Sequence, residues 1–281
     1  WALGKSGPAA AAAVPDLIAI LLESDHPGRG AWLPAMEALG RNPQALRWAT
    51  RARRILEGVS SPEAATELAR LTSWYAEMLQ IAGSSRAAIT WSERAIEQAR
   101  SVGDGGALWK AYDTLDWAKF AVGESTGGRY QRLALEVSEQ LGDLWAQANV
   151  LNSLGFFAYF EGRWTEALDF YDRSRVISAK AGDPFMPALQ ASNMAEIYCE
   201  RGNLDEAEGI LRDSLPVLRA AGRRVFVGYG LTFLGRVAAR GNRFDEALAM
   251  FDEARALFAE IGAPEEIVEV TARIAECRTF M

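Results

Sequence analysis

Few residues in this sequence have the type and spacing that catalysis or metal binding requires. His26 is the only histidine among 281 residues, so a metal site or a catalytic dyad would have no second imidazole. It lies in the turn-like segment SDHPGRG, which favours a solvated loop residue. Cys199 and Cys277 lie within helical apolar patterns, where a free cysteine behaves as a small buried hydrophobe. These residues predict no metal site and no catalytic centre.

Two short motifs resemble parts of catalytic sites. Residues 4–6 read GKS, like the end of a phosphate-binding loop, but the preceding strand and first glycine of that motif are absent from the sequence. The adjacent acids Asp205 and Glu206 could do acid–base chemistry. The same pair recurs at Asp245 and Glu246, again at a predicted helix start, where acids complement the helix dipole. We therefore expect a protein that is not an enzyme and has no cofactor.

The composition favours a folded protein rather than a nucleic-acid or membrane binder. Hydrophobic residues make up 49% of the chain and the formal net charge is −7. This charge argues against general affinity for nucleic acid or anionic membranes. The most apolar stretch, residues 9–22, is short and contains Pro15 and Asp16, so it predicts a core helix. Two cysteines give no disulfide framework, which favours the cytoplasm. We interpret the chain, which starts at Trp1, as a piece of a longer protein.

The sequence repeats itself with a period of about 40 residues. Segment 161–171 reads EGRWTEALDFY, and related sequences stand at 201–211 (RGNLDEAEGIL) and 241–251 (GNRFDEALAMF). Each contains the glycine or asparagine of a short turn between two helices. Four glycines recur with the same period, each after an apolar periodic run, and they are candidates for the left-handed position that ends a helix. These glycines are Gly142, Gly182, Gly222 and Gly262.

Small and large side chains follow the same period. The small residues let two antiparallel helices approach closely, and the large residues fill the space between that pair and the next. The small set is Gly155, Ala195, Gly235, Ala167, Ala207 and Ala247. The large set is Leu154, Met194, Leu234, Tyr171, Leu211 and Phe251. Because a single helix pair cannot bury its own apolar face, the repeats are expected to stack.

At these residues the chain resembles the tetratricopeptide repeat family. The family pattern reads Leu154-Gly155, Ala167, Tyr171 and Ser174 in one repeat, and it recurs one and two periods later. The resemblance implies an all-α, right-handed α-solenoid of stacked antiparallel helix pairs. We expect divergent helical hairpins over residues 1–60 and the repeat array, with a truncated last repeat, over 61–281. The period exceeds the family's usual length of about 34 residues, so the helices should be longer.

The resemblance implies two functions. The first is a non-catalytic module that binds a protein or peptide partner on the concave groove. The second follows from the long period, which is similar to that of the C-terminal repeats of bacterial LuxR- or MalT-like signalling ATPases and class III nucleotide cyclases. There the repeats would be a regulatory arm that controls the remaining domains, so that the partner is the rest of its own chain.

By analogy with the family, the first helix of each pair lines the groove, and its inward positions give the candidate binding residues. In three repeats these candidates are Asn149, Asn152, Phe156, Tyr159, Ser192, Glu196, Tyr229 and Arg236. Upstream the register is ambiguous by one residue, which adds Tyr112 from one register and Trp117 from the other. The segment LGFFAYFEG is aromatic on all sides, so Phe156 and Tyr159 are either groove anchors or core.

Two further surfaces stand out. Arg47, Arg51 and Arg54 lie on one face of a predicted helix, as a solvated face, a docking surface for an upstream domain, or a site for an acidic partner or nucleic acid. Residues 264–281 should form an unpaired first helix with an apolar face made of Ile267, Val270 and Ile274. Such an open end predicts an end-to-end homodimer.

Overall fold

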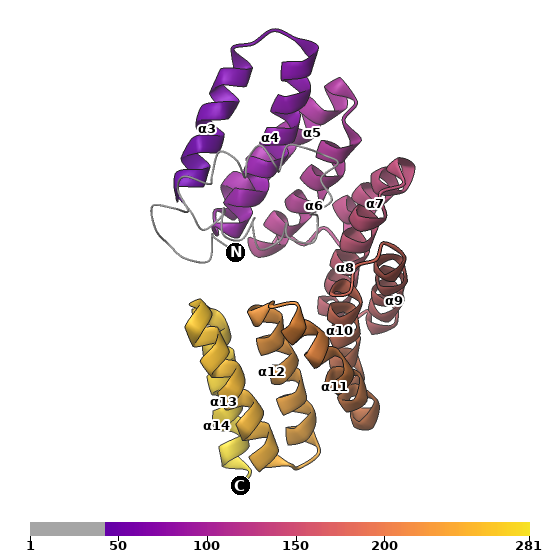
Figure 1. The fold of residues 1–281 in the computed structure, drawn as a ribbon, viewed down its shortest axis with the longest axis vertical. Coiled ribbons are helices and arrows are strands. Elements are labelled where there is room, and N and C mark those ends of the chain that lie inside the picture. Colours follow the sequence, from indigo (N-terminus) through magenta and orange to yellow (C-terminus); the bar gives the residue numbers. More distant parts are fainter. Residues whose placement is uncertain (1–42) are drawn as a thin grey trace. The chain divides into compact units, whose positions relative to one another are not determined.

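The computed structural model describes residues 43–281, and this part of the chain is entirely helical (Figure 1). The chain divides into two compact units, residues up to Ser153 and residues from Leu154 onward. The GKS motif at residues 4–6, the apolar segment 9–22 and His26 lie outside the described residues, as does most of the expected N-terminal segment 1–60. The expected division at residue 60 remains a prediction.

The first unit consists of antiparallel helices joined by short turns. Its helices are α3 (Pro43–Glu57), α4 (Pro62–Ile81), α5 (Ser85–Val102), α6 (Gly105–Ala121), α7 (Arg129–Leu141) and the start of α8 (Leu144–Phe160). Helix α4 packs on α5 and α6 packs on α7, while α4 also contacts α6. First helices of neighbouring pairs are therefore in contact, as in a stacked repeat.

The second unit repeats this arrangement. After the end of α8 it contains α9 (Trp164–Lys180), α10 (Met186–Glu200), α11 (Leu204–Ala220), α12 (Arg224–Arg240), α13 (Phe244–Ile261) and α14 (Pro264–Thr279). Helix α10 pairs with α11 and α12 with α13, and α10 contacts α12. Helices α9, α11 and α12 each have 17 residues, and two such helices with their two short turns account for the length of the sequence period. The expectation of an all-α helical repeat fold is confirmed.

The turns have the backbone conformation that the repeated glycines predicted. Gly142, Gly182, Gly222 and Gly262 all have positive φ angles, between 66° and 76°. The turn inside each pair has the same requirement. There Gly162 and Gly202 are followed, one period on, by Asn242 with φ of 58°, the only described non-glycine residue with positive φ. Asparagine tolerates this region better than most residues, so the third copy keeps the turn without glycine.

Close contact between the two helices of a pair explains the small residues. A Cβ atom on Gly155 would lie 2.6 Å from the ring of Tyr171, and one on Gly235 would lie 2.5 Å from the ring of Phe251. In the middle repeat the smaller Leu211 stands at the ring position, and Ala195 replaces the glycine. In these three repeats the small residue is therefore glycine where the opposing helix presents an aromatic ring, and alanine where it presents leucine.

The C-terminal helix α14 differs from its expectation. It was expected to leave Val270 and Ile274 open for a neighbour, but both side chains are buried where α14 packs against α13 and α12. The apolar stripe is thus used within the chain. Ile267, the third residue of the expected face, is partly buried, and the expected end-to-end homodimer remains a prediction.

We expect Gly235→Ala to lower the free energy of unfolding by about 2 kcal/mol, because the new methyl group overlaps the Phe251 ring. Adding Phe251→Leu, which recreates the Ala195–Leu211 pair, should recover part of that loss. Urea unfolding of the two single variants and the double variant measures this coupling.

Gly209→Ala is the matched control, since a Cβ atom there meets nothing within 4 Å on helix α11. Alanine's higher helix propensity should stabilise that variant by about 0.5–1 kcal/mol. Strictly additive effects of Gly235→Ala and Phe251→Leu would show that the close contact is not what selects glycine.

Candidate functional site

The ten candidate groove residues are divided between the two units. Four lie in the first unit: Tyr112, Trp117, Asn149 and Asn152. Six lie in the second unit: Phe156, Tyr159, Ser192, Glu196, Tyr229 and Arg236. Each group is considered by itself.

In the first unit, both aromatic candidates have partners inside the fold. Tyr112 is buried, stacks on Tyr130 and accepts a hydrogen bond from the guanidinium of Arg100 at 2.6 Å. The indole Nε1 of Trp117 donates to Ser153 Oγ at 3.1 Å. Tyr112 therefore offers no surface to a partner, and Trp117 is half-buried with its polar atom satisfied.

The two asparagine candidates are partly exposed on α8. The side-chain amide of Asn149 donates to the Trp145 carbonyl one turn earlier, at 2.9 Å. Such a bond leaves the amide oxygen available to another donor. Asn152 lies one turn further along the same helix and is also partly exposed.

The same helix, α6, also contributes Lys110 to a buried ion pair. Lys110 Nζ lies 3.0 Å from a carboxylate oxygen of Glu77 on α4 and is positioned over the rings of Trp74 and Trp109. Burial lowers the pKa of Lys110 and raises the pKa of Glu77, while their mutual attraction opposes both shifts. This pair connects the first helices of two adjacent repeats.

Two further acids on α6 are also used inside the unit. Asp113 accepts hydrogen bonds from Gln131 Nε2 at 2.8 Å and Ser153 Oγ at 3.2 Å. Asp116 accepts from the backbone N–H of Gln131 at 2.9 Å and from the Thr126 hydroxyl. The N-cap of helix α7 is Gly128, which has no side chain to cap the helix, so Asp116 satisfies a free N–H group of its first turn. Burial raises the pKa of both carboxyls.

In the second unit, two candidates take part in local structure. The Ser192 hydroxyl is buried and donates to the Ala188 carbonyl at 2.9 Å. The Tyr229 hydroxyl donates to Glu266 on α14 at 2.8 Å, and its ring packs near Phe258. Tyr229 thus links α14 to the preceding helix pair through a hydrogen bond and ring packing. Ser192 is buried and is not accessible to a partner.

The other candidates of this unit meet in one charged network. Arg236 on α12 donates to Glu196 on α10 at 2.5 Å, and its other terminal nitrogen donates to Glu200. The guanidinium of Arg240 lies 3.2 Å from the second oxygen of Glu200 and also donates to the Cys199 carbonyl. Two arginines of one repeat therefore bind two glutamates of the repeat before it.

Tyr159 on α8 extends this network, because its hydroxyl donates a hydrogen bond to Glu196. Burial raises the pKa of Glu196, and the charge of Arg236 opposes this shift. Burial would lower the pKa of Arg236, but Glu196 and Glu200 raise it. Burial and the nearby Glu196 also raise the pKa of Tyr159. Tyr159 therefore stays a neutral donor and Arg236 stays charged at neutral pH.

The regular stacking of repeats arranges this surface, which we call the first-helix face, in two rows. One row holds Phe156, Glu196 and Arg236, and the other, one helical turn on, holds Phe160, Glu200 and Arg240. Each helix thus contributes a matched pair: aromatic on α8, acidic on α10 and basic on α12. The Phe156 and Phe160 rings are 4.4 Å apart between centroids, and Phe160 remains 59% exposed.

Half of this face was not predicted from the sequence, since no residue of the second row was named. Phe160, Glu200 and Arg240 each follow a predicted position by one helical turn. That spacing, together with the sequence period, is the signal that could have found them. Tyr159 and Phe156 were expected as alternatives between groove and core, and both are partly buried.

The described residues hold little that suggests catalysis. No group of three or more His, Cys, Asp or Glu residues in residues 43–281 is arranged to hold a metal ion. Cys199 and Cys277 are buried free cysteines, and burial raises the pKa of both thiols. Raised thiol pKa values disfavour the reactive thiolate. No helix in the described part of the chain is long and apolar enough to cross a membrane.

Comparison with known proteins agrees with this repeat architecture. Residues 187–260 match the sequence model of the tetratricopeptide repeat family. They include the α10–α11 and α12–α13 pairs and most of the two rows of the first-helix face. This segment of the chain therefore resembles tetratricopeptide repeats. No curated protein sequence matches it.

Several solved structures share the fold at low sequence identity. BtubC (BKLC) from P. vanneervenii is 18% identical with a TM-score of 0.63, covering 77% of this chain and 91% of that one. A Rap protein complexed with competence and sporulation factor is 14% identical, with a TM-score of 0.59 and coverages of 89% and 73%. The STAND protein PH0952 from Pyrococcus horikoshii, which has a tetratricopeptide repeat sensor, is 12% identical with a TM-score of 0.56. The match covers 98% of this chain and 53% of the STAND protein.

The charged network gives a stability prediction. We expect Arg236→Met to lower the free energy of unfolding by about 2–3 kcal/mol, because it leaves the half-buried Glu196 without its counter-charge. Arg240→Met, at an arginine whose side chain is 46% exposed, should cost less than about 1 kcal/mol. Urea unfolding measures both values. Equal losses would mean that burial does not set the strength of these pairs.

Proposed function

We propose that this chain is a non-catalytic protein-interaction module whose second unit binds a protein or peptide through the first-helix face. The family match and the structural neighbours support a role in protein interaction or regulation. The first-helix face is our choice because it combines an aromatic pair, of which Phe160 is exposed, with charged groups on the neighbouring helices. Interfaces are enriched in aromatic residues and arginine, which suits this composition.

The observation that carries the proposal is the Phe156–Phe160 pair. An aromatic side chain exposed as much as Phe160 gains apolar burial when a partner covers it. The ring of Phe156 packs against the ring of Phe160 and so helps to hold it in place. The arginine–glutamate network beside the pair holds the helices at fixed spacing, which keeps the surface ready for a partner and reduces the cost of ordering on binding.

The finer features of the proposal follow from the chemistry of the chain. Two buried free cysteines suit a reducing compartment, so we place the protein in the cytoplasm. A net charge of −7 favours a protein partner over nucleic acid or an anionic membrane. The acids Asp205, Glu206, Asp245 and Glu246 stand in the first turns of α11 and α13, a position that serves the helix dipole rather than acid–base chemistry.

Cross-linking and capture from a lysate of the source cell tests this proposal. We expect wild-type protein to capture a partner that Phe160→Ala loses by about tenfold or more, as for an interface anchor. Val176→Ala is the control, because Val176 is also an exposed apolar residue of the second unit but lies on α9, a second helix that contributes no residue to this face. Equal capture by all three proteins would contradict binding through the first-helix face.

The second candidate function is the regulatory arm of a larger bacterial signalling ATPase, nucleotide cyclase or transcription regulator. It is favoured by the likeness of nearly the whole chain to the STAND protein, which contains further parts beyond the matched region. In that case the first-helix face would bind another part of the same polypeptide, and an inducer or partner protein would release it.

An antibody against residues 154–281 distinguishes the two functions. The regulatory-arm function expects it to detect, in source-cell extract, a polypeptide much longer than this chain whose nucleotide turnover or DNA binding changes with Phe160→Ala. Detection of a chain of only this length would contradict the second function and leave the first one standing.

A further inference from the structure

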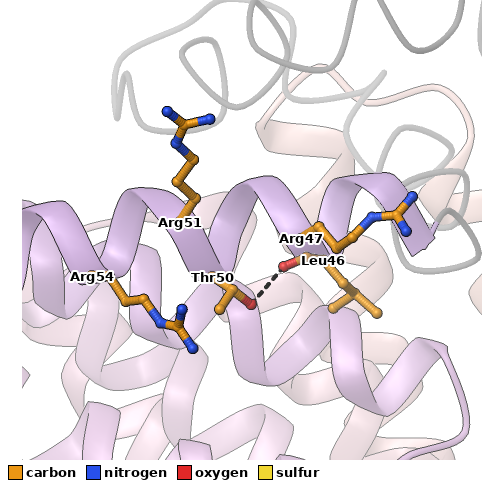
Figure 2. Close-up of a pocket in the computed structure, with 5 residues that line it drawn as sticks. All are labelled: Leu46, Arg47, Thr50, Arg51 and Arg54. Carbon is orange, nitrogen blue, oxygen red and sulfur yellow. Dashed lines mark hydrogen bonds between the residues drawn. The ribbon is translucent and has the colours of Figure 1, made fainter.

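The strongest surface outside the first-helix face is the exposed side of α3 in the first unit. Arg47, Arg51 and Arg54 follow one another at i, i+4 and i+7, which places them on one face of the helix over a length of about 10 Å. All three are exposed. With Leu46 and Thr50 they line an open depression of about 420 Å³ (Figure 2).

These arginines differ from the fourth arginine of the same helix. Arg53 is buried, pairs with Glu57 and stacks on the Trp91 ring, so it holds α3 to α5. In contrast, no carboxylate among the described residues lies within ion-pair distance of Arg47, Arg51 or Arg54. Figure 2 shows their guanidinium groups pointing away from the helix in different directions.

The local charge is opposite to that of the chain. Helix α3 contains four arginines and one acid, Glu57, which gives a local charge of +3 in a protein with a net charge of −7. Elsewhere, exposed arginines of the second unit, such as Arg212 and Arg243, are neutralised by neighbouring glutamates. Three guanidinium groups on one face, without a carboxylate partner among residues 43–281, are suited to bind carboxylates, often with two hydrogen bonds each.

Exposed apolar groups lie directly beside the arginine stripe. Trp48 is 42% exposed and Ile55 is 60% exposed, and the helical period places both on the flank next to Arg51. The Arg51 guanidinium lies 5.7 Å from the centre of the Trp48 ring. A surface of tryptophan, arginine and an aliphatic side chain has the composition of a protein-binding hot spot.

We propose that this face of α3 binds an acidic segment of a partner protein, with carboxylates on Arg47, Arg51 and Arg54 and an apolar side chain against Trp48 and Ile55. Nucleic acid is the other polyanion to consider. It would meet the stripe but also the negative field of the rest of the chain, and it offers no aliphatic group for Ile55. A helical segment with acids spaced by four and three residues matches the stripe along its length.

The test uses fluorescence anisotropy with three labelled probes on the whole chain. The first probe is a synthetic helical peptide with glutamates spaced by four and three residues and leucines on the adjacent positions. The second has the same composition in scrambled order, and the third is a short single-stranded DNA. We expect the first probe to bind most tightly, and the variant R47E/R51E/R54E to weaken it by about tenfold or more.

The matched control is R86E/R129E/R278E. These three arginines are also exposed and have no carboxylate partner among the described residues, but they are dispersed over α5, α7 and α14, so the change in net charge is identical. We expect it to weaken the first probe by less than about threefold. The neutral variant R47Q/R51Q/R54Q, which cannot repel an acidic probe, should weaken binding as well.

Three results would overturn the proposal. Equal weakening by the dispersed control would reduce the effect to overall charge. Tighter binding of DNA than of the first peptide, lost in the stripe variant, would make the face a nucleic-acid surface. No binding of the first peptide to wild-type protein would remove the site. Far-ultraviolet circular dichroism and urea unfolding confirm that each variant used in the comparison is folded.

Discussion

The fold of each helix pair depends on how closely its two helices can approach. Where the second helix presents an aromatic ring, as Tyr171 and Phe251 do, the first helix has no room for even a Cβ atom at Gly155 and Gly235. This contact limits how close the two helices of such a pair can come. The rows of the first-helix face are aligned because equivalent positions of successive repeats lie side by side, as the ion pairs between α10 and α12 show.

Much of this architecture could be predicted because its signals are local and repeated. Turn glycines, small–large contacts and helix-start acids recur with one common period, so each copy supports the others. The C-terminal helix could not be predicted as well, because burial of Val270 and Ile274 depends on how far α13 covers it. A sequence period shows which residues occupy equivalent positions in successive repeats, but not which side chains pack against them.

The candidate site was less predictable, for the same reason. Tyr112 occupies a groove position by analogy, yet Arg100 and Tyr130 from two other helices enclose it. Glu196 and Arg236 were both named as groove residues, but the sequence did not indicate that they bind each other. That pairing depends on equivalent positions of successive repeats lying side by side in space, although they are far apart in the chain. Charge networks of this kind become visible only when the repeats are stacked.

The two rows also restrict how the array can evolve. Identical repeats would bring glutamate against glutamate or arginine against arginine at these positions, and such like charges repel. A duplicated repeat would therefore need different residues at these two positions, while its turns and helix contacts could stay the same. Loss or exchange of the α10–α11 repeat would place phenylalanine next to arginine instead of glutamate. The order of the repeats is thereby fixed by electrostatics, although their backbones are interchangeable.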